Sequence, residues 1–146
     1  MKQIKHIPLQ NNITHPHKRL QHLAGRKLLT ELFDYFPLSL IRIADTKKPF
    51  LADEAFHFSI SHCDDYAAAI VSTQNRVGVD IEIPQEKIER IRHKFLSNEE
   101  MELVQTLKAS SIQNLTLAWS IKETIFKWYG DGNVDFKKHI HINKCS

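Results

Sequence analysis

Residues 117–130 of the 146-residue chain read LAWSIKETIFKWYG, and this stretch decides how the rest of the sequence is interpreted. Four of its apolar residues recur at helical spacing and predict the core face of a helix: Leu117, Ile121, Ile125 and Trp128. Gly130 suits the left-handed position just past a helix end. Glu123 and Lys127 are four residues apart and share one face of this helix. A pair of this kind, taken alone, is usually an exposed ion pair on an amphipathic helix.

A second set of acidic residues upstream changes that interpretation. Residues 77–83 (VGVDIEI) alternate strictly, which predicts a strand with Asp80 and Glu82 on the same face. Carboxylates two residues apart on a strand are separated by ~6.6 Å along it and point the same way. Oxygen ligands of this kind suit Mg²⁺, which takes one or two carboxylates and completes its shell with waters and phosphate oxygens.

Three motifs follow one another along the chain: FSISH at 58–62, GVDIE at 78–82 and WSIKETIFK at 119–127. In this order they resemble the signature of the 4′-phosphopantetheinyl transferases, in the longer type that activates peptide synthetases. The small acyl-carrier-protein synthases of that family instead place the metal strand at the start of the chain. The resemblance covers residues 16–142 and implies an α+β fold in which an antiparallel β meander packs with helices.

The resemblance also implies a reaction and a set of site residues. The reaction is the Mg²⁺-dependent transfer of 4′-phosphopantetheine from coenzyme A to a serine of an acyl or peptidyl carrier protein. Glu123 would be the base and the third metal ligand beside Asp80 and Glu82, and Lys127 would neutralise pyrophosphate oxygens. The coenzyme contacts that the resemblance implies are Arg19, Arg26, Lys48, Ser61 and His62.

The remaining elements are predicted from local patterns. A basic helix is expected from Pro16 to about residue 33, with a core face that comprises Leu20, Leu23, Ala24, Leu28 and Leu32. Short turns predict that the strands around Ser61, Ile70 and Asp80 are antiparallel neighbours. Ser97 and Glu100 form a capping box, which accounts for Glu100 without a role in the site. Alternation at 139–142 predicts a last strand.

Two parts of the chain are expected, 1–83 with the basic helix, meander and metal strand, and 84–146 with the catalytic helix. The longer family type continues with several more strands. The resemblance therefore implies an incomplete C-terminal subdomain, a chain shortened at both ends and an exposed edge at the last strand.

Composition restricts the remaining classes of protein. The net charge of +3 and the apolar share of 42% are ordinary for a soluble globular protein and suit a polyanionic ligand or an acidic partner. We expect a cytoplasmic protein, because no apolar run approaches ~20 residues, the start lacks a signal peptide, and Cys63 and Cys145 suit free thiols. The histidine pairs at 15 and 17 and at 139 and 141 have no evident third metal ligand.

Two alternatives stay open beside the transferase. One is a coenzyme A or carrier-protein binding module without catalysis. The other, a nucleic-acid binder, rests on the basic helix alone and is disfavoured because the ordered carboxylates would repel phosphates.

Overall fold

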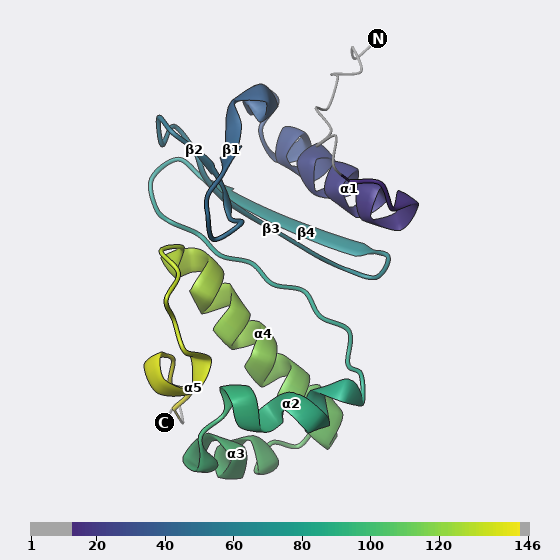
Figure 1. The fold of residues 1–146 in the computed structure, drawn as a ribbon, viewed down its shortest axis with the longest axis vertical. Helices are drawn as coiled ribbons and strands as arrows, with labels where there is room; N and C mark the ends of the chain where they lie inside the picture. Colours follow the sequence, from purple (N-terminus) through teal and green to yellow (C-terminus); the bar gives the residue numbers. More distant parts are fainter. Residues whose placement is uncertain (1–12, 144–146) are drawn as a thin grey trace.

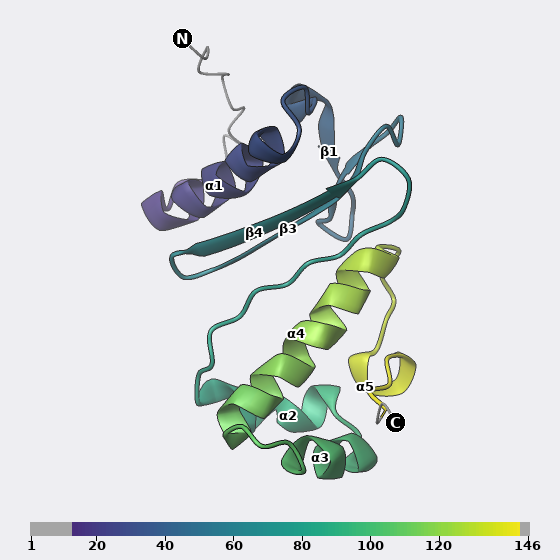
Figure 2. The same cartoon turned by 180° about the vertical axis from the view of Figure 1, so that it is seen from behind.

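The computed structural model describes residues 13–143 and shows the predicted α+β fold, with antiparallel strand pairs packed against helices (Figure 1). The expected Cys145 thiol lies outside the described residues. The β3–β4 hairpin lies between α1 on one side and α4 on the other (Figures 1 and 2). The elements in chain order are α1 (Pro16–Leu32), the 3₁₀ turn η1 (Leu38–Leu40), β1 (Ile41–Ile43), β2 (Pro49–Leu51), β3 (His57–Cys63), β4 (Tyr66–Ser72), α2 (Lys87–Phe95), α3 (Asn98–Gln105), α4 (Ser111–Tyr129) and α5 (Phe136–His139).

Helix α1 begins at Pro16, as predicted, because the fixed φ of proline suits the first turn. It lies so close to β3 that a Cβ added at Gly25 would be 2.5 Å from Ile60 Cγ2. This close approach sets the contact line of the helix, whose buried residues are Gly25, Arg26, Leu29 and Thr30. The predicted core face is therefore wrong at its ends, and Leu20 and Leu32 are exposed.

Strands β3 and β4 form the predicted hairpin, in which Ser61 pairs with Ala68 and Cys63 with Tyr66. One face of the hairpin and α1 enclose a first apolar core, which comprises Leu29, Phe36, Leu38, Leu51 and Phe58. Strands β1 and β2 form a second, separate antiparallel pair.

The prediction of a strand at 77–83 is wrong, because this segment is extended but belongs to no sheet. The backbone N–H groups of this segment donate hydrogen bonds to side chains of β3, not to the backbone of β3. The N–H of Val79 donates to Ser59 Oγ at 3.2 Å, and the N–H of Ile81 donates to Ser61 Oγ at 3.2 Å. Two serine hydroxyls at a spacing of two residues thus replace the ladder that alternation alone predicts.

The second half of the structure is helical and has its own apolar core, which comprises Ile88, Phe95, Leu96, Val104, Leu115 and Ala118. The capping box of Ser97 and Glu100 is confirmed at the start of α3. Helix α4 begins with a second capping box at Ser110 and ends at Gly130, whose φ of 81° is left-handed as predicted.

The core face predicted for α4 is wrong. Its four residues are all exposed: Leu117, Ile121, Ile125 and Trp128. The helix instead packs through Leu115, Ala118 and Lys122, which also recur at helical spacing. Helix α4 is apolar on two faces, and helical spacing alone cannot choose between them.

The strand predicted at 139–142 is also wrong. Residues 136–139 form the short helix α5, because the Asp135 side chain accepts hydrogen bonds from the N–H groups of Lys137 and Lys138. Beyond it, Ile140 is buried and the N–H of Ile142 donates to Glu100 Oε1 at 2.8 Å. No helix in the described part of the chain is long and apolar enough to cross a membrane.

Candidate active site

Asp80 is a buried carboxylate of the predicted site, with a side chain that is 3% exposed. Its Oδ1 accepts a hydrogen bond from Ser61 Oγ at 2.9 Å and an ion-pair contact from Lys127 Nζ at 2.5 Å. Its Oδ2 is buried without a hydrogen-bond partner. A buried carboxylate oxygen in that state is costly unless another ligand satisfies it.

Glu82 lies next along the same segment and contacts two side chains. The indole N–H of Trp119 donates to its Oε1 at 3.3 Å, and the Cys63 thiol donates to its Oε2 at 3.5 Å. Burial raises the pKa of the Cys63 thiol, and the charge of Glu82 raises it further. Cys63 is therefore a neutral donor beside the carboxylate, which agrees with the predicted free thiol.

Glu123 faces the other two carboxylates from α4. Burial raises its pKa above the ordinary range, and the charges of Asp80 and Glu82 add to this while Lys127 opposes it. Glu123 is thus close enough to Asp80 and to Glu82 to be repelled by their charges. A divalent cation would relieve this repulsion and satisfy Asp80 Oδ2, so the donor set fits Mg²⁺.

The carboxylate oxygens of Asp80, Glu82 and Glu123 do not all lie within 4.8 Å of one another. Among residues 13–143, the ligand atoms that all lie within 4.8 Å of one another belong to a different set, His17, Asp64 and Asp65. That set is mostly exposed and lies at the β3–β4 turn, where His17 Nε2 is 3.1 Å from the carbonyl oxygen of Asp64. At the predicted site, the Lys127 ammonium holds Asp80 Oδ1 instead.

The segment that carries Asp80 and Glu82 is pressed directly against α4. A Cβ added at Gly78 would lie 2.2 Å from the carbonyl oxygen of Thr124 and 2.8 Å from the backbone nitrogen of Trp128. Only glycine permits this approach, because both clashing atoms belong to the helix backbone. Gly78 therefore sets the distance between the segment and the helix that carries Glu123.

A cavity of about 190 Å³ opens beside Glu123 and is also lined by Lys48 and Lys127, among others, whereas Asp80 and Glu82 do not line it. A neighbouring cavity of about 240 Å³ shares Lys48 and is also lined by Arg76 and Tyr129. Burial lowers the pKa of the Lys48 ammonium, and Arg76 lowers it further while Asp131 opposes the shift. The structure thus brings the predicted Lys48 to the same cavity as Glu123 and Lys127.

Three of the predicted coenzyme contacts lie elsewhere. Arg19 and Arg26 are on α1, across the hairpin from α4 (Figure 2), and His62 is exposed on β3. Arg26 is buried on α1 and donates to His22 Nδ1 at 2.9 Å. Burial lowers the pKa of its guanidinium. None of the three lines either cavity.

Sequence reasoning missed the contributions of Trp119 and Lys122. The hydrogen bond from Trp119 to Glu82 joins residues 37 positions apart, so it could not be inferred without the fold. Lys122 is completely buried. The only sequence signal for it is its helical spacing from Leu115 and Ala118, and that spacing ordinarily marks apolar residues.

Comparison with known proteins gives one family and several relatives. The family model of the 4′-phosphopantetheinyl transferase superfamily matches residues 76–145. The chain is 33% identical over 115 residues to enterobactin synthase component D of Salmonella austin, an alignment that covers 78% of this chain and 49% of the relative. It is 34% identical over 94 residues to 4′-phosphopantetheinyl transferase gsp of Aneurinibacillus migulanus, covering 64% and 39% of the two chains. The chain thus spans about half the length of these curated relatives or less.

Proposed function

The chain belongs to the 4′-phosphopantetheinyl transferase superfamily, and we propose that it transfers 4′-phosphopantetheine from coenzyme A to a serine hydroxyl of an acyl or peptidyl carrier protein. The observation that carries this proposal is the buried, unpartnered Oδ2 of Asp80 beside two further carboxylates. Such a site needs a cation, and Glu123, one of the three carboxylates, lines a cavity together with Lys48 and Lys127. An anionic diphosphate fits that arrangement.

Asp80, Glu82 and Glu123 are the proposed ligands of Mg²⁺. When bound, Mg²⁺ would neutralise the pyrophosphate of coenzyme A and stabilise the charge that develops on the leaving phosphate. Ser61 donates to Asp80 Oδ1 and so orients this ligand. The coenzyme contacts that the resemblance implies all stay predictions, those of Arg19, Arg26, Lys48, Ser61 and His62.

Glu123 is the proposed general base. Of the three carboxylates it is the one that lines the cavity shared with Lys48 and Lys127, so it can reach a proton of a substrate bound there. The carrier serine oxygen forms a bond to the phosphorus of the pantetheine phosphate, the bond to the adenosine-side phosphate breaks, and Glu123 takes the serine proton. The leaving group is adenosine 3′,5′-bisphosphate. Lys127 and Lys48 would compensate its negative charge from the shared cavity.

Mass spectrometry of an apo carrier protein, incubated with this chain, coenzyme A and Mg²⁺, tests the proposal. We expect a gain of one phosphopantetheine that EDTA abolishes. Glu123→Gln should slow the transfer by about 10²–10⁴-fold, because it removes the base. Glu102→Gln, at an exposed position on α3, is the matched control and should leave the rate unchanged.

The outcomes separate the two candidate functions. Calorimetric binding of coenzyme A without any mass gain would overturn the transferase and favour the binding module. An unchanged transfer rate in Glu123→Gln would instead remove the role proposed for this residue.

A further inference from the structure

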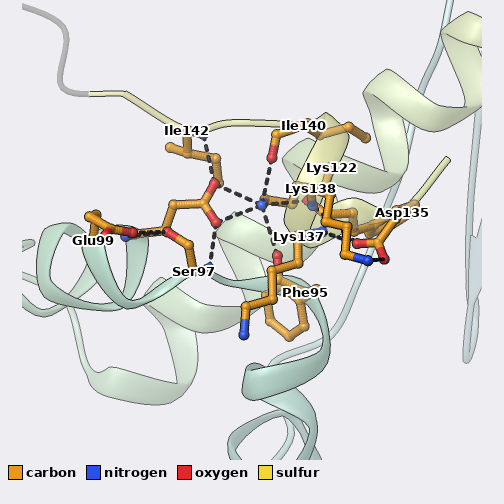
Figure 3. Close-up of polar contacts among 11 residues, drawn as sticks. Phe95, Ser97, Glu99, Lys122, Asp135, Lys137, Lys138, Ile140 and Ile142 are labelled. Carbon is orange, nitrogen blue, oxygen red and sulfur yellow. Dashed lines mark hydrogen bonds and ion pairs between the residues drawn. The ribbon is translucent and has the colours of Figure 1, made fainter.

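Lys122 lies at the centre of a polar network in the interior of the helical half (Figure 3). Its ammonium donates to the carbonyl oxygens of Phe95, Phe136 and Ile140 at 2.7–2.8 Å. It also pairs with the Glu100 carboxylate at 2.7 Å. One side chain of α4 thereby holds the end of α2, the start of α3 and both ends of α5.

The network satisfies both charges of the buried pair. Glu100 accepts hydrogen bonds from the N–H groups of Ser97 and Ile142 in addition to Lys122. Removal of one member of such a pair leaves the other charge buried without compensation, which is strongly destabilising. Because the Lys122 ammonium also donates to the carbonyl oxygens of Phe95 and Phe136, the backbone positions of both phenylalanines depend on Lys122.

The same two phenylalanines hold the ring of Trp119. The Phe95 and Trp119 ring centroids are 5.1 Å apart in an edge-to-face arrangement, and those of Trp119 and Phe136 are 5.4 Å apart. Trp119 precedes Lys122 by three residues, so both side chains leave α4 on adjacent turns. The residues whose carbonyls bind Lys122 thus carry the rings that fix the indole.

The indole in turn donates its N–H to Glu82 Oε1 at 3.3 Å. We propose that Lys122 is a positioning residue for the metal site, which orients Glu82 through Phe95, Phe136 and Trp119. This inference rests on the proposed function, because it takes Glu82 as a metal ligand. A hydrogen-bonded partner behind a metal ligand fixes its orientation and raises metal affinity.

Mn²⁺ affinity, measured by calorimetry on the intact chain, tests the inference without reference to transfer. Trp119→Phe keeps an aromatic ring but removes the donor to Glu82, and we expect about tenfold weaker binding. Lys122→Met should weaken binding to a similar extent. The double variant should be little worse than either single variant, because both act on the same contact.

Val104→Ala is the control for a purely structural role. Val104 is buried in the same apolar core, so its truncation destabilises the helical half without touching the network. We expect its Mn²⁺ affinity to match that of the unmodified chain. Equal weakening in Val104→Ala and Lys122→Met, or unchanged affinity in folded Lys122→Met, would overturn the inference.

Phe136→Leu decides the question if Lys122→Met does not fold. It removes a ring from Trp119 but keeps the carbonyl that Lys122 binds, and unchanged Mn²⁺ affinity in this variant would contradict the proposed relay. Tryptophan emission in a Trp128→Phe background provides a metal-free measurement of Trp119. We expect Lys122→Met or Phe136→Leu to shift that emission, and an unshifted spectrum would overturn the inference. A chain that binds Mn²⁺ normally but transfers nothing would refute the proposed function alone.

Discussion

Lys127 places a positive charge against Asp80 Oδ1, while the Oδ2 of the same carboxylate stays without a partner. Its ammonium lies 2.5 Å from Asp80 Oδ1 and 2.9 Å from Ser61 Oγ. Burial raises the pKa of Glu123, and the charge of Lys127 partly opposes that rise. A metal ion bound by these carboxylates has to share Asp80 with Lys127 or displace it.

Lys127→Met should consequently separate metal binding from transfer. We expect tighter Mn²⁺ binding, by about tenfold, because charges a few Å apart near a protein surface interact by ~1–4 kcal/mol. Transfer should nevertheless slow, because the charge that compensates the leaving phosphate is lost. Lys137→Met, at an exposed position on α5, is the control for both measurements. Weaker Mn²⁺ binding in Lys127→Met would show that the ammonium assists the metal instead of competing with it.

Gly78 is the second residue on which the geometry of the site depends. In Gly78→Ala the new methyl group would meet the Thr124 carbonyl at 2.2 Å, so the segment has to move away from α4. We expect a loss of about 1–3 kcal/mol in the free energy of unfolding, together with weaker Mn²⁺ binding. Urea denaturation and calorimetry measure the two effects. Gln85→Ala, at an exposed position just after the segment, should change neither, and an unaffected Gly78→Ala would refute the close approach.

Among the elements, α4 shows what helical spacing can predict and what it cannot. Its existence, its end at Gly130 and the shared face of Glu123 and Lys127 follow from local sequence. The choice between its two apolar faces depends on neighbours that local sequence does not specify. Leu115→Ala should therefore cost about 2–5 kcal/mol of unfolding free energy. Ile121→Ala, on the face first predicted as core, should cost less than about 1 kcal/mol, and a larger cost would restore that prediction.

At Glu100 in helix α3, too, one interaction follows from local sequence and another depends on the fold. The capping box was predictable from its spacing to Ser97, whereas the pairing with Lys122 needs the fold. Burial alone would raise the pKa of Glu100, but hydrogen bonds from Lys122, Ser97 and Ile142 lower it below its ordinary value. A carboxyl whose folded-state pKa is lowered contributes stability above its unfolded pKa, and that stability is lost as the pH falls through the folded-state pKa.

The free energy of unfolding, measured as the pH is lowered, tests whether stability falls in this direction. We expect the unmodified chain to lose unfolding free energy as the pH falls below about 5, and Glu100→Gln to be less stable at neutral pH with a shallower loss. Glu102→Gln on the same helix should follow the unmodified chain. A parallel acid loss in Glu100→Gln would mean that other groups account for it.

For the whole molecule, the sequence predicted which residues meet better than it predicted the backbone that brings them together. Asp80, Glu82, Glu123 and Lys127 converge as expected, although the segment 77–83 is not a strand. Alternation reports which side chains share a face, and an extended segment satisfies it with or without a ladder. The division of the chain at residue 83 stays a prediction.

The site joins the two apolar cores of the molecule. The extended segment runs between the hairpin and α4 (Figures 1 and 2), Asp80 contacts Ser61 on one side and Lys127 on the other, and Arg76 donates to the Tyr129 carbonyl at 3.1 Å. A cation bound at Asp80 therefore requires both halves to be folded. Binding to the folded state alone stabilises it by about 2.7 kcal/mol at a metal concentration of 100 times Kd.

Thermal unfolding with and without Mg²⁺ thus measures the site through the stability of the whole chain. We expect Mg²⁺ to raise the Tm of the unmodified chain and Asp80→Asn to abolish that rise, since it removes the central ligand. Asp64→Asn removes a member of the exposed His17 set and should keep the rise. If Asp64→Asn abolished the rise and Asp80→Asn did not, the metal would bind at the β3–β4 turn, and the carboxylates around Glu123 would have to act without it.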